Sequence, residues 1–331
     1  MYSIDDISFE MRTITDLRTR VATLGDGPVA LFIHGWPECW YSWREQMVAL
    51  ANAGFRTVAL DMPGFGQTDS LPAIADYNVK RICAFMEELV IQLNGKSPVV
   101  LVGHDWGAIN CWQFTLRHPE LVSRLVNMSV PLHPMGDRPP IPLLRDHFKE
   151  EFFYQIYFQE PGVAEAEFDS DPEGILRGLY CAPDTPRDPP RLGRSISEGG
   201  GWIGRLGRPR EQPEWLSNEA LAYYLETYRR SGFTGGINYY RNLDANWHLM
   251  QPYRDTIITC PVLFLAGGAD STVRGANEEQ LRARMSKRVA DLQIRLLPGK
   301  GHWIQSEACA EVNAALLEFL TGTSRPDAGA R

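Results

Sequence analysis

The sequence predicts an α/β fold with a mostly parallel, doubly wound sheet and an inserted helical cap. Short apolar runs alternate with segments of helical periodicity in the first 130 residues, a pattern typical of right-handed βαβ crossovers. Strand signals then almost vanish, and they return after residue 256. We therefore expect a core formed by residues 1–130 and 256–320, a cap formed by residues 131–255, and a disordered tail at residues 321–331.

The predicted core strands are apolar or alternating runs bounded by Gly, Pro or polar turns. The first two alternate in polarity and are expected to form an antiparallel hairpin at the sheet edge. The later runs are continuously apolar, as expected of strands covered on both faces. The strands are predicted at residues 7–14, 17–25, 29–35, 56–66, 99–102, 121–130, 261–270 and 292–299.

The predicted core helices lie between these strands and carry apolar residues at helical spacing. Gly54 is expected to end the first helix, and Pro119 follows the end of the third. The helices are predicted at residues 40–53, 79–93, 108–118, 276–288 and 308–320. The cap is helical and irregular, and its stretch from Cys181 to Pro213 is rich in Pro, Arg and Gly.

The composition is that of an ordinary globular protein, with 44% hydrophobic and 22% charged residues in 331. A formal net charge of −8 gives no support for binding to nucleic acid or an anionic membrane. Neither a secretory signal nor an apolar run of the roughly 20 residues that span a membrane is found. Six scattered cysteines without a C-x-x-C pair are expected to be reduced. We therefore expect a cytoplasmic protein without a metal.

The stretch from Val99 to Asn110, VVLVGHDWGAIN, has the pattern of a nucleophile elbow between a buried strand and a helix. Gly103 and Gly107 lie two residues on either side of Asp105, where a Cβ would collide with the crossing backbone. The centre of such an elbow is usually Ser. On the G-x-D-x-G pattern alone, a turn or N-cap role is the more common one for Asp105, but the strand before it and the helix after it favour a nucleophile.

An Asp nucleophile decides the expected chemistry. A carboxylate that attacks an ester or amide gives only a mixed anhydride, which makes Asp105 a poor catalyst of acyl transfer. Its attack on an electrophilic sp³ carbon instead displaces a leaving group and forms an alkyl ester that water cleaves afterwards.

Cleavage of such an ester needs a base, and His302 in the stretch PGKGHWIQSE is the candidate. It follows the last predicted strand, at the edge where open α/β sheets bind ligands. Asp270 follows the preceding strand and would orient the imidazole. A structural role for His302 and a helix N-cap for Asp270 are the alternatives. The order nucleophile, acid, histidine along the chain favours the catalytic interpretation.

The ester step also needs hydrogen-bond donors for an oxyanion. The backbone N–H of Trp36, after a strand, and that of Trp106, after Asp105, are the candidates. His34 and His104 flank these positions, and we expect them to support the site or the fold rather than to react. The first donor belongs to the motif HGWP, which consists of His34, Gly35, Trp36 and Pro37.

Five segments resemble the α/β-hydrolase-fold epoxide hydrolases, and the soluble epoxide hydrolase catalytic domain most closely. The similarity extends from about Leu17 to Leu320. HGxP and GHDWG alone also occur in haloalkane dehalogenases, so the two cap segments are the more specific. The segments are His34–Met47, Gly103–Ala108 and Gly301–Glu307 in the core, and Phe153–Phe168 and Ser231–Trp247 in the cap.

The resemblance implies that Tyr154 and Tyr240 donate hydrogen bonds to an epoxide oxygen. An opening epoxide expels a strongly basic alkoxide, and a phenol with a pKa of about 10 stays protonated at neutral pH and can act as donor. Packing against the sheet is the alternative, and it is the role expected of Tyr157 and Tyr239. The chain departs from the family at Pro63, where an Arg is usual.

The sequence thus predicts an epoxide hydrolase that converts a lipophilic epoxide and water to a vicinal diol through an ester on Asp105. No cofactor, nucleic acid or membrane insertion is expected, and a homodimer is compatible with the sequence. Two alternatives stay open: a haloalkane dehalogenase with the same nucleophile, and a catalytically silent binding protein. The size and stereochemistry of the substrate are not predicted, and detoxification and a specific metabolic step both fit.

Overall fold

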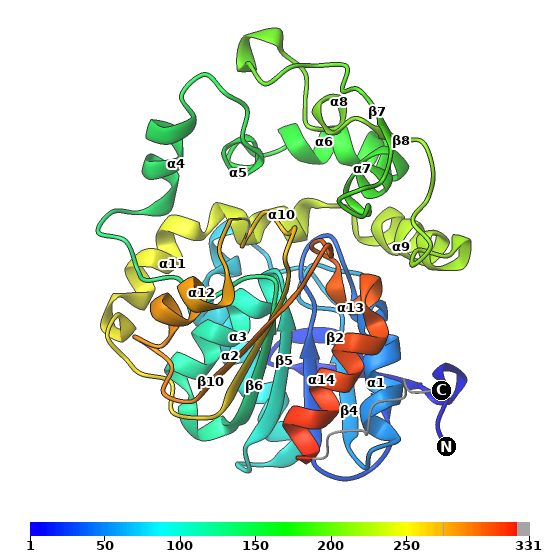
Figure 1. Ribbon diagram of the computed structural model, residues 1–331, viewed down its shortest axis with the longest axis vertical. Coiled ribbons are helices and arrows are strands. Elements are labelled where there is room, and N and C mark those ends of the chain that lie inside the picture. Colours follow the sequence, from blue (N-terminus) through cyan, green and yellow to red (C-terminus); the bar gives the residue numbers. More distant parts are fainter. Residues whose placement is uncertain (274, 323–331) are drawn as a thin grey trace.

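The computed structural model describes residues 1–273 and 275–322, and an eight-stranded sheet lies at its centre (Figure 1). Its strand order is β1-β2-β4-β3-β5-β6-β9-β10. The first two strands form the predicted antiparallel hairpin, and the other six strands of this sheet run parallel to one another. The fold class is therefore confirmed. The strands are β1 (Ser8–Ile14), β2 (Leu17–Leu24), β3 (Val29–Ile33), β4 (Arg56–Leu60), β5 (Val99–His104), β6 (Val122–Met128), β9 (Val262–Gly267) and β10 (Leu292–Leu297).

Helices cover both faces of this sheet and leave the central strands buried. Alternate residues of one strand point to opposite faces, so Phe32 of β3 packs into the cluster with α1 and α14, whereas Leu31 packs into the cluster with α2 and α3. This explains why the central strands are continuously apolar. The core helices are α1 (Arg44–Ala51), α2 (Val79–Asn94), α3 (Trp106–Arg117), α12 (Glu278–Met285), α13 (Ile304–Glu307) and α14 (Cys309–Thr321).

The chain between β6 and β9 forms helices above the carboxyl edge of the sheet (Figure 1). This arrangement supports the proposed cap, although the exact division of the chain stays a prediction. The helices are α4 (Pro140–Phe148), α5 (Tyr154–Tyr157), α6 (Val163–Ser170), α7 (Pro172–Leu179), α8 (Ile203–Leu206), α9 (Asn218–Ser231), α10 (Thr234–Arg241) and α11 (Leu243–Met250).

Several short elements escaped the sequence prediction because they are too short to show a period. A pair of two-residue strands, β7 (Arg187–Asp188) and β8 (Arg208–Pro209), lies in the Pro/Gly-rich part of the cap. The predicted helix at residues 40–53 starts as a 3₁₀ turn and becomes α1 only at Arg44. The 3₁₀ turns are η1 (Ile4–Asp6), η2 (Trp40–Trp43), η3 (Ile74–Tyr77), η4 (Pro119–Leu121), η5 (Ile196–Glu198) and η6 (Gln251–Tyr253).

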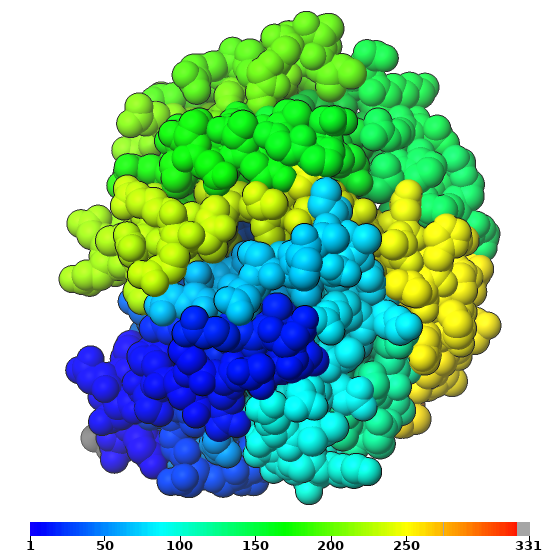
Figure 2. Space-filling model, turned by 180° about the vertical axis from the view of Figure 1, so that it is seen from behind, coloured from blue at the N-terminus to red at the C-terminus, as the bar shows by residue number. Residues whose placement is uncertain are grey.

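Helix α9 joins the cap to the core. Figure 2 shows it in yellow-green between the green helices of the cap and the blue N-terminal part of the core. The Tyr228 hydroxyl donates to the carbonyl oxygen of Glu38 over 3.1 Å, and the Tyr224 hydroxyl lies 2.7 Å from Ser42 Oγ. Both contacts reach the segment that follows β3, so the cap holds the loop that borders the site.

The rest of the sequence prediction concerns the tail, the cysteines and the membrane. Residues 323–331 of the predicted tail lie outside the described residues, and Thr321 still belongs to α14. All six cysteines are free thiols. In the described ranges, none of the helices is both long and apolar enough to span a bilayer.

Candidate active site

Asp105 lies at the sharp turn between β5 and α3. Its φ of 52° falls in the left-handed region, which is rare for a residue with a side chain. The turn is tight, because a Cβ on Gly107 would lie 1.9 Å from the carbonyl oxygen of Ile33, and one on Gly103 would lie 2.6 Å from that of Gly107. The structure thus gives Asp105 the geometry that the glycine spacing predicts.

The loop after β3 passes beside the Asp105 carboxylate. The Trp36 backbone N–H donates to Asp105 Oδ1 over 2.8 Å, and a Cβ on Gly35 would lie 2.4 Å from Asp105 Cβ. Trp106, the other predicted donor, is the first residue of α3, where a backbone N–H has no partner within the helix. The Trp36 N–H therefore contacts the carboxylate, and the Trp106 N–H belongs to the residue that follows Asp105.

His34 supports this loop from below. Its Nε2 accepts the backbone N–H of Met62 over 2.9 Å, so the ring proton is on Nδ1, which donates to the Gly35 carbonyl oxygen over 2.8 Å. Burial lowers the pKa of His34. The Gly35 carbonyl belongs to the same peptide unit as the Trp36 N–H, so His34 fixes the peptide that faces Asp105.

The imidazole of His302 lies between two carboxylates. Its Nδ1 is 2.8 Å from Asp270 Oδ2 and its Nε2 is 3.5 Å from Asp105 Oδ2. Burial alone would lower the pKa of His302, but the two carboxylates outweigh it and hold the pKa well above its usual range. Burial would raise the pKa of Asp270, yet His302 and the Thr272 N–H keep it below its usual value. The structure therefore brings together the predicted nucleophile, base and acid.

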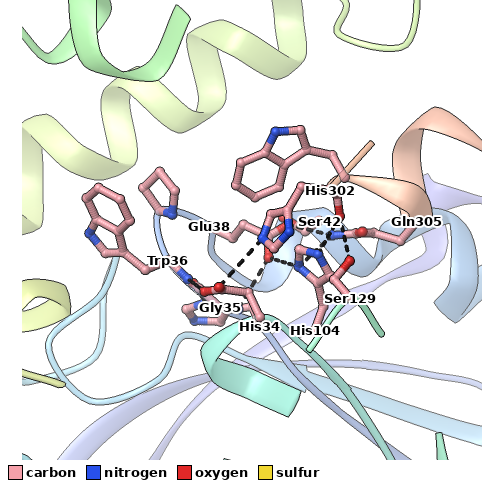
Figure 3. Close-up of polar contacts among 12 residues, drawn as sticks. His34, Gly35, Trp36, Glu38, Ser42, His104, Ser129, His302 and Gln305 are labelled. Carbon is pink, nitrogen blue, oxygen red and sulfur yellow. Dashed lines mark hydrogen bonds and ion pairs between the residues drawn. The ribbon is translucent and has the colours of Figure 1, made fainter. Parts of the chain in front are cut away.

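Buried polar groups hold the backbone of His302 in place (Figure 3). Its carbonyl oxygen accepts from His104 Nε2 and from Ser129 Oγ, each over 2.8 Å. His104 Nδ1 lies 2.7 Å from Glu38 Oε2, and the Gln305 amide donates to Glu38 Oε1 over 2.6 Å. Burial would raise the pKa of Glu38, but His104 keeps it below its usual value.

The sequence prediction missed Glu38, Ser129 and Gln305. Glu38 follows the HGWP motif directly, and Gln305 lies inside the stretch GHWIQSE. Their buried position beside His104 is a tertiary contact between segments more than 60 residues apart. Their nearness to the two motifs was the signal available in the sequence.

Tyr154 and Tyr240 approach the site from the cap. Their ring centroids are 5.8 Å apart, and the Tyr240 ring is edge-on to Trp106 with centroids 5.0 Å apart. Burial and the negative charge of Asp105 raise the pKa of both phenols. Gln155 Nε2 donates to Tyr154 Oη over 2.9 Å and thus leaves the phenol proton free to be donated elsewhere. Two neutral phenols of the cap are therefore near enough to Asp105 for its charge to raise their pKa.

The two tyrosine-bearing helices are tied to one another by polar side chains that the sequence did not single out. The amide of Gln159 donates to the carbonyl oxygens of Gln155, over 2.8 Å, and Tyr240, over 3.2 Å. Arg241 donates to the Phe158 carbonyl oxygen over 2.8 Å and forms a buried ion pair with Glu165. The separation of the two phenols is thus fixed by the cap itself.

The neighbouring tyrosines use their hydroxyl groups elsewhere. The Tyr157 hydroxyl donates to Glu167 Oε2 over 3.1 Å, and the buried Tyr239 hydroxyl donates to the Pro63 carbonyl oxygen over 3.2 Å. Pro63 is the position at which the sequence lacks the usual Arg, and its backbone here anchors a cap residue. The structure therefore places Tyr157 and Tyr239 in packing positions.

Comparisons with known proteins agree with this geometry. Residues 28–308 match the family described as alpha/beta hydrolase fold. The chain is 40% identical to epoxide hydrolase A of Mycobacterium tuberculosis, over 92% of this chain and 95% of that protein. The crystal structure of epoxide hydrolase A from Mycobacterium thermoresistibile superposes with a TM-score of 0.88 at 36% identity, covering 96% of this chain and 98% of that one.

The chain belongs to the epoxide hydrolase family of the α/β-hydrolase fold. The resemblance to the soluble branch has its counterpart in the bifunctional epoxide hydrolase 2 of Rattus norvegicus, which is 33% identical over 96% of this chain and 56% of that protein. The predicted family is thereby confirmed. A site that opens an epoxide needs a group that attacks a ring carbon and a group that donates a proton to the ring oxygen.

Proposed function

We propose that this protein hydrolyses an epoxide to a vicinal diol in two steps, with Asp105 as the nucleophile. One observation carries the proposal. The Asp105 carboxylate receives the Trp36 N–H on one oxygen and faces His302 with the other, and its charge raises the pKa of two neutral phenols of the cap. A carboxylate with donors on the far side of a substrate is suited to displacement at carbon, with the leaving oxygen protonated as it departs.

In the first step, Asp105 Oδ2 attacks the less hindered ring carbon and forms a C–O bond, while the C–O bond of the epoxide at that carbon breaks. The departing oxygen takes a proton from Tyr154 or Tyr240, because an alkoxide is more basic than a phenolate. The new ester carries no charge, so His302 loses one of the two carboxylates that raise its pKa. His302 then releases its proton, which converts the tyrosine phenolate back to the neutral phenol.

In the second step, neutral His302 removes a proton from water, and the hydroxide attacks the Asp105 Cγ. The N–H groups of Trp36 and Trp106 stabilise the oxyanion that forms, a contribution that is typically worth about 10²–10³-fold in rate for each donor. The tetrahedral intermediate then expels the diol oxygen, which takes the proton held by His302. The Asp105 carboxyl that is left gives its own proton to His302, which restores the resting ion pair. Asp270 stabilises the imidazolium during this step.

A label in the solvent tests this two-step route. We expect one turnover in H₂¹⁸O, with enzyme in excess, to place the label in the Asp105 carboxylate and to give an unlabelled diol. Mass spectrometry of the diol and of the peptide that contains Asp105 measures both. A labelled diol on the first turnover means that water attacks the epoxide directly, and it contradicts a covalent route.

The haloalkane dehalogenase alternative predicts halide release from a haloalkane. A halide needs N–H donors beside the leaving group, and Figure 3 shows the Trp36 indole turned away from His302. The indole ring lies against Phe158 and Phe168 of the cap, with centroids 5.3 and 6.1 Å away. A halide assay run beside the epoxide assay separates the two. A catalytically silent protein would release neither halide nor diol.

The substrate, location and assembly are further parts of this proposal. Aromatic side chains border Tyr154 and Tyr240, which favours a lipophilic epoxide. A panel of terminal, styrene-type and fatty-acid epoxides, scored by diol formation, identifies the class. The location that we propose is the cytoplasm, whose reducing conditions suit six free cysteines, and cell fractionation tests it. The assembly that we propose is a homodimer, and a measurement of the molecular mass in solution tests it.

A further inference from the structure

Trp202 lies in the Pro/Gly-rich part of the cap, outside every motif that predicts the site, yet it contacts two groups of the site. Its ring is stacked on Tyr154, with centroids 4.6 Å apart and planes 12° apart. It is also stacked on Trp36, with centroids 6.0 Å apart and planes again 12° apart. Phe158 meets the same ring edge-on at 5.7 Å. Trp202 therefore lies against one face of the Tyr154 ring.

The backbone on both sides of Trp202 is held by buried or half-buried polar groups. The Glu167 carboxylate accepts the N–H of Trp202 over 2.8 Å and that of Ile203 over 3.0 Å. Tyr157 donates to the same carboxylate over 3.1 Å. These bonds satisfy N–H groups at the start of α8 that have no partner within a helix, so the position of Trp202 is fixed relative to α6.

Arg205 fixes the residues that precede Trp202. Its guanidinium donates to four carbonyl oxygens and lies over the Phe152 ring, with Cζ 4.5 Å from the centroid. A loop rich in glycine would otherwise lose much conformational entropy to hold one shape. The four carbonyl oxygens belong to Ser195, Gly199, Gly200 and Gly201, at 3.0, 2.8, 3.0 and 2.7 Å.

Tyr154 depends on outside support for its orientation. It is the first residue of α5, a helix of only four residues, and its side chain is half-buried. A phenol turns about its Cβ–Cγ bond in a broad energy well, so a flat neighbour against the ring face sets the plane. Trp202 is that neighbour, and stacked aromatic pairs are stabilised beyond the area that they bury.

We propose that Trp202 is a positioning residue for ring opening, because it holds the phenol of Tyr154 in the plane from which it donates to the epoxide oxygen. Glu167 and Arg205 in turn hold Trp202. This inference rests on the proposed function. It predicts that Trp202 matters for the first step, in which Tyr154 acts, and not for the second, in which water, His302 and the Trp36 N–H act.

A double-mutant cycle measured on each step separately tests the inference. With enzyme in excess over a styrene-type epoxide, the formation and the decay of the ester on Asp105 give the two rates. We expect Trp202→Ala to slow formation about tenfold, since small misplacements of a reacting group have effects of this order or larger. Decay of the ester should change less than twofold. Trp202→Phe, which keeps a flat ring, should restore most of the lost rate.

The decisive arm of the cycle removes the phenol. In a Tyr154→Phe background, Trp202→Ala should slow formation less than twofold, because no phenol is left to position. Glu167→Gln, which keeps the side-chain shape but accepts fewer N–H bonds, should slow formation partially and serves if Trp202→Ala does not fold. Trp247→Ala is the control, since Trp247 is also a half-buried cap tryptophan but donates to the Gly136 carbonyl oxygen.

Three results overturn the inference. The first is that Trp202→Ala slows ester formation equally in the wild-type and Tyr154→Phe proteins. The second is that Trp202→Ala slows only the decay of the ester. The third is that Trp202→Ala raises KM without a change in the rate of ester formation. The last would make Trp202 only a wall of the substrate pocket. If the unmodified protein forms no ester with any epoxide, the proposed function itself fails and this inference fails with it. If the unmodified protein does turn over an epoxide and the effects of Trp202→Ala and Tyr154→Phe are additive, the inference is rejected and the proposed function stands.

Discussion

His302 Nε2 lies 3.5 Å from Asp105 Oδ2, so the proposed base and the proposed nucleophile face each other as an ion pair. With Asp270 on its other nitrogen, the imidazole has a raised pKa and holds its proton in the resting protein. Alkylation of Asp105 removes one negative charge from this arrangement. The ring therefore becomes a base only after the ester has formed, which orders the two proposed steps.

Replacement of His302 should trap the ester. His302→Asn keeps the Asp105 nucleophile and both phenols, so the first step still occurs, but no base remains to activate water. We expect one equivalent of epoxide to be consumed and the protein mass to increase by the mass of the epoxide, on a peptide that contains Asp105. Intact-protein and peptide mass spectrometry measure this. His248→Asn, an exposed change in α11, is the control, and an unmodified His302→Asn protein contradicts the expectation.

Replacement of the nucleophile should abolish turnover and leave the fold intact. Asp105→Ala removes the atom that bonds to the substrate and adds no atom to the buried start of α3. We expect no diol and no adduct, with an unchanged circular dichroism spectrum. A variant that still turns over epoxide rules out covalent catalysis by Asp105.

The ion pair also predicts how stability depends on pH. The folded pKa of His302 is above the value of about 6.5 in an unfolded chain, so the folded protein binds this proton more tightly. The proton on His302 stabilises the folded protein fully at a pH below the unfolded pKa, and this stabilisation is lost as the pH rises through the folded pKa. The free energy of unfolding of the wild type, minus that of Asp105→Ala, should therefore fall as the pH rises above about 6.5. Urea denaturation measures it, and parallel curves for the two proteins contradict the ion pair.

The phenols should act together. Loss of one hydroxyl leaves the other within reach of the oxygen, so Tyr154→Phe or Tyr240→Phe alone should slow ring opening moderately. The double variant should slow it by about 10²-fold or more, the range of general acid catalysis. Single-turnover rates measure this step, and Tyr253→Phe, in the 3₁₀ turn η6, is the control. Unchanged rates in the double variant remove both tyrosines from the mechanism.

The local parts of the site could be predicted from the sequence because they depend on contacts between near neighbours in the chain. The turn at Asp105 needs glycine at both ends of a five-residue stretch, and the strand before this stretch and the helix after it set the turn. The chain order placed Asp270 and His302 at the same edge of the sheet as Asp105. The two tyrosines came from resemblance, since no local pattern distinguishes Tyr154 from Tyr157.

The supporting residues could not be predicted because their roles come from tertiary contacts. Glu38 touches His104 across 66 positions of sequence, and Gln159 touches the Tyr240 backbone across 81. Trp202 follows three glycines in a stretch without periodicity, and its place beside Tyr154 depends on Glu167 and Arg205. Such contacts form only when distant segments of the core, or of the cap, come together, which no short stretch of sequence encodes.

The Glu38–His104 pair should be important for stability. Its atoms lie 2.7 Å apart, and the side chains are 3% and 0% exposed. Removal of one member of a buried pair leaves the other uncompensated and typically costs about 3–5 kcal/mol. We expect Glu38→Ala to lower the free energy of unfolding by this amount, as measured by urea denaturation. Glu87→Ala is the matched control, because Glu87 is 42% exposed and 3.8 Å from His118, and it should change stability by about 0–1 kcal/mol.

Gly107 should tolerate no side chain. An added Cβ would lie 1.9 Å from the Ile33 carbonyl oxygen and 2.8 Å from that of His34, both parts of the backbone that cannot move aside without disturbing β3. Because overpacking of a close contact typically costs about 1–3 kcal/mol and backbone clashes more, we expect Gly107→Ala to lower the melting temperature strongly and to reduce ester formation at Asp105. Gly136→Ala is the control, since its Cβ would come no closer than 3.7 Å to any neighbour and its backbone accepts an alanine. Equal melting temperatures for the two variants would mean that α3 and β3 do not approach each other so closely at the elbow.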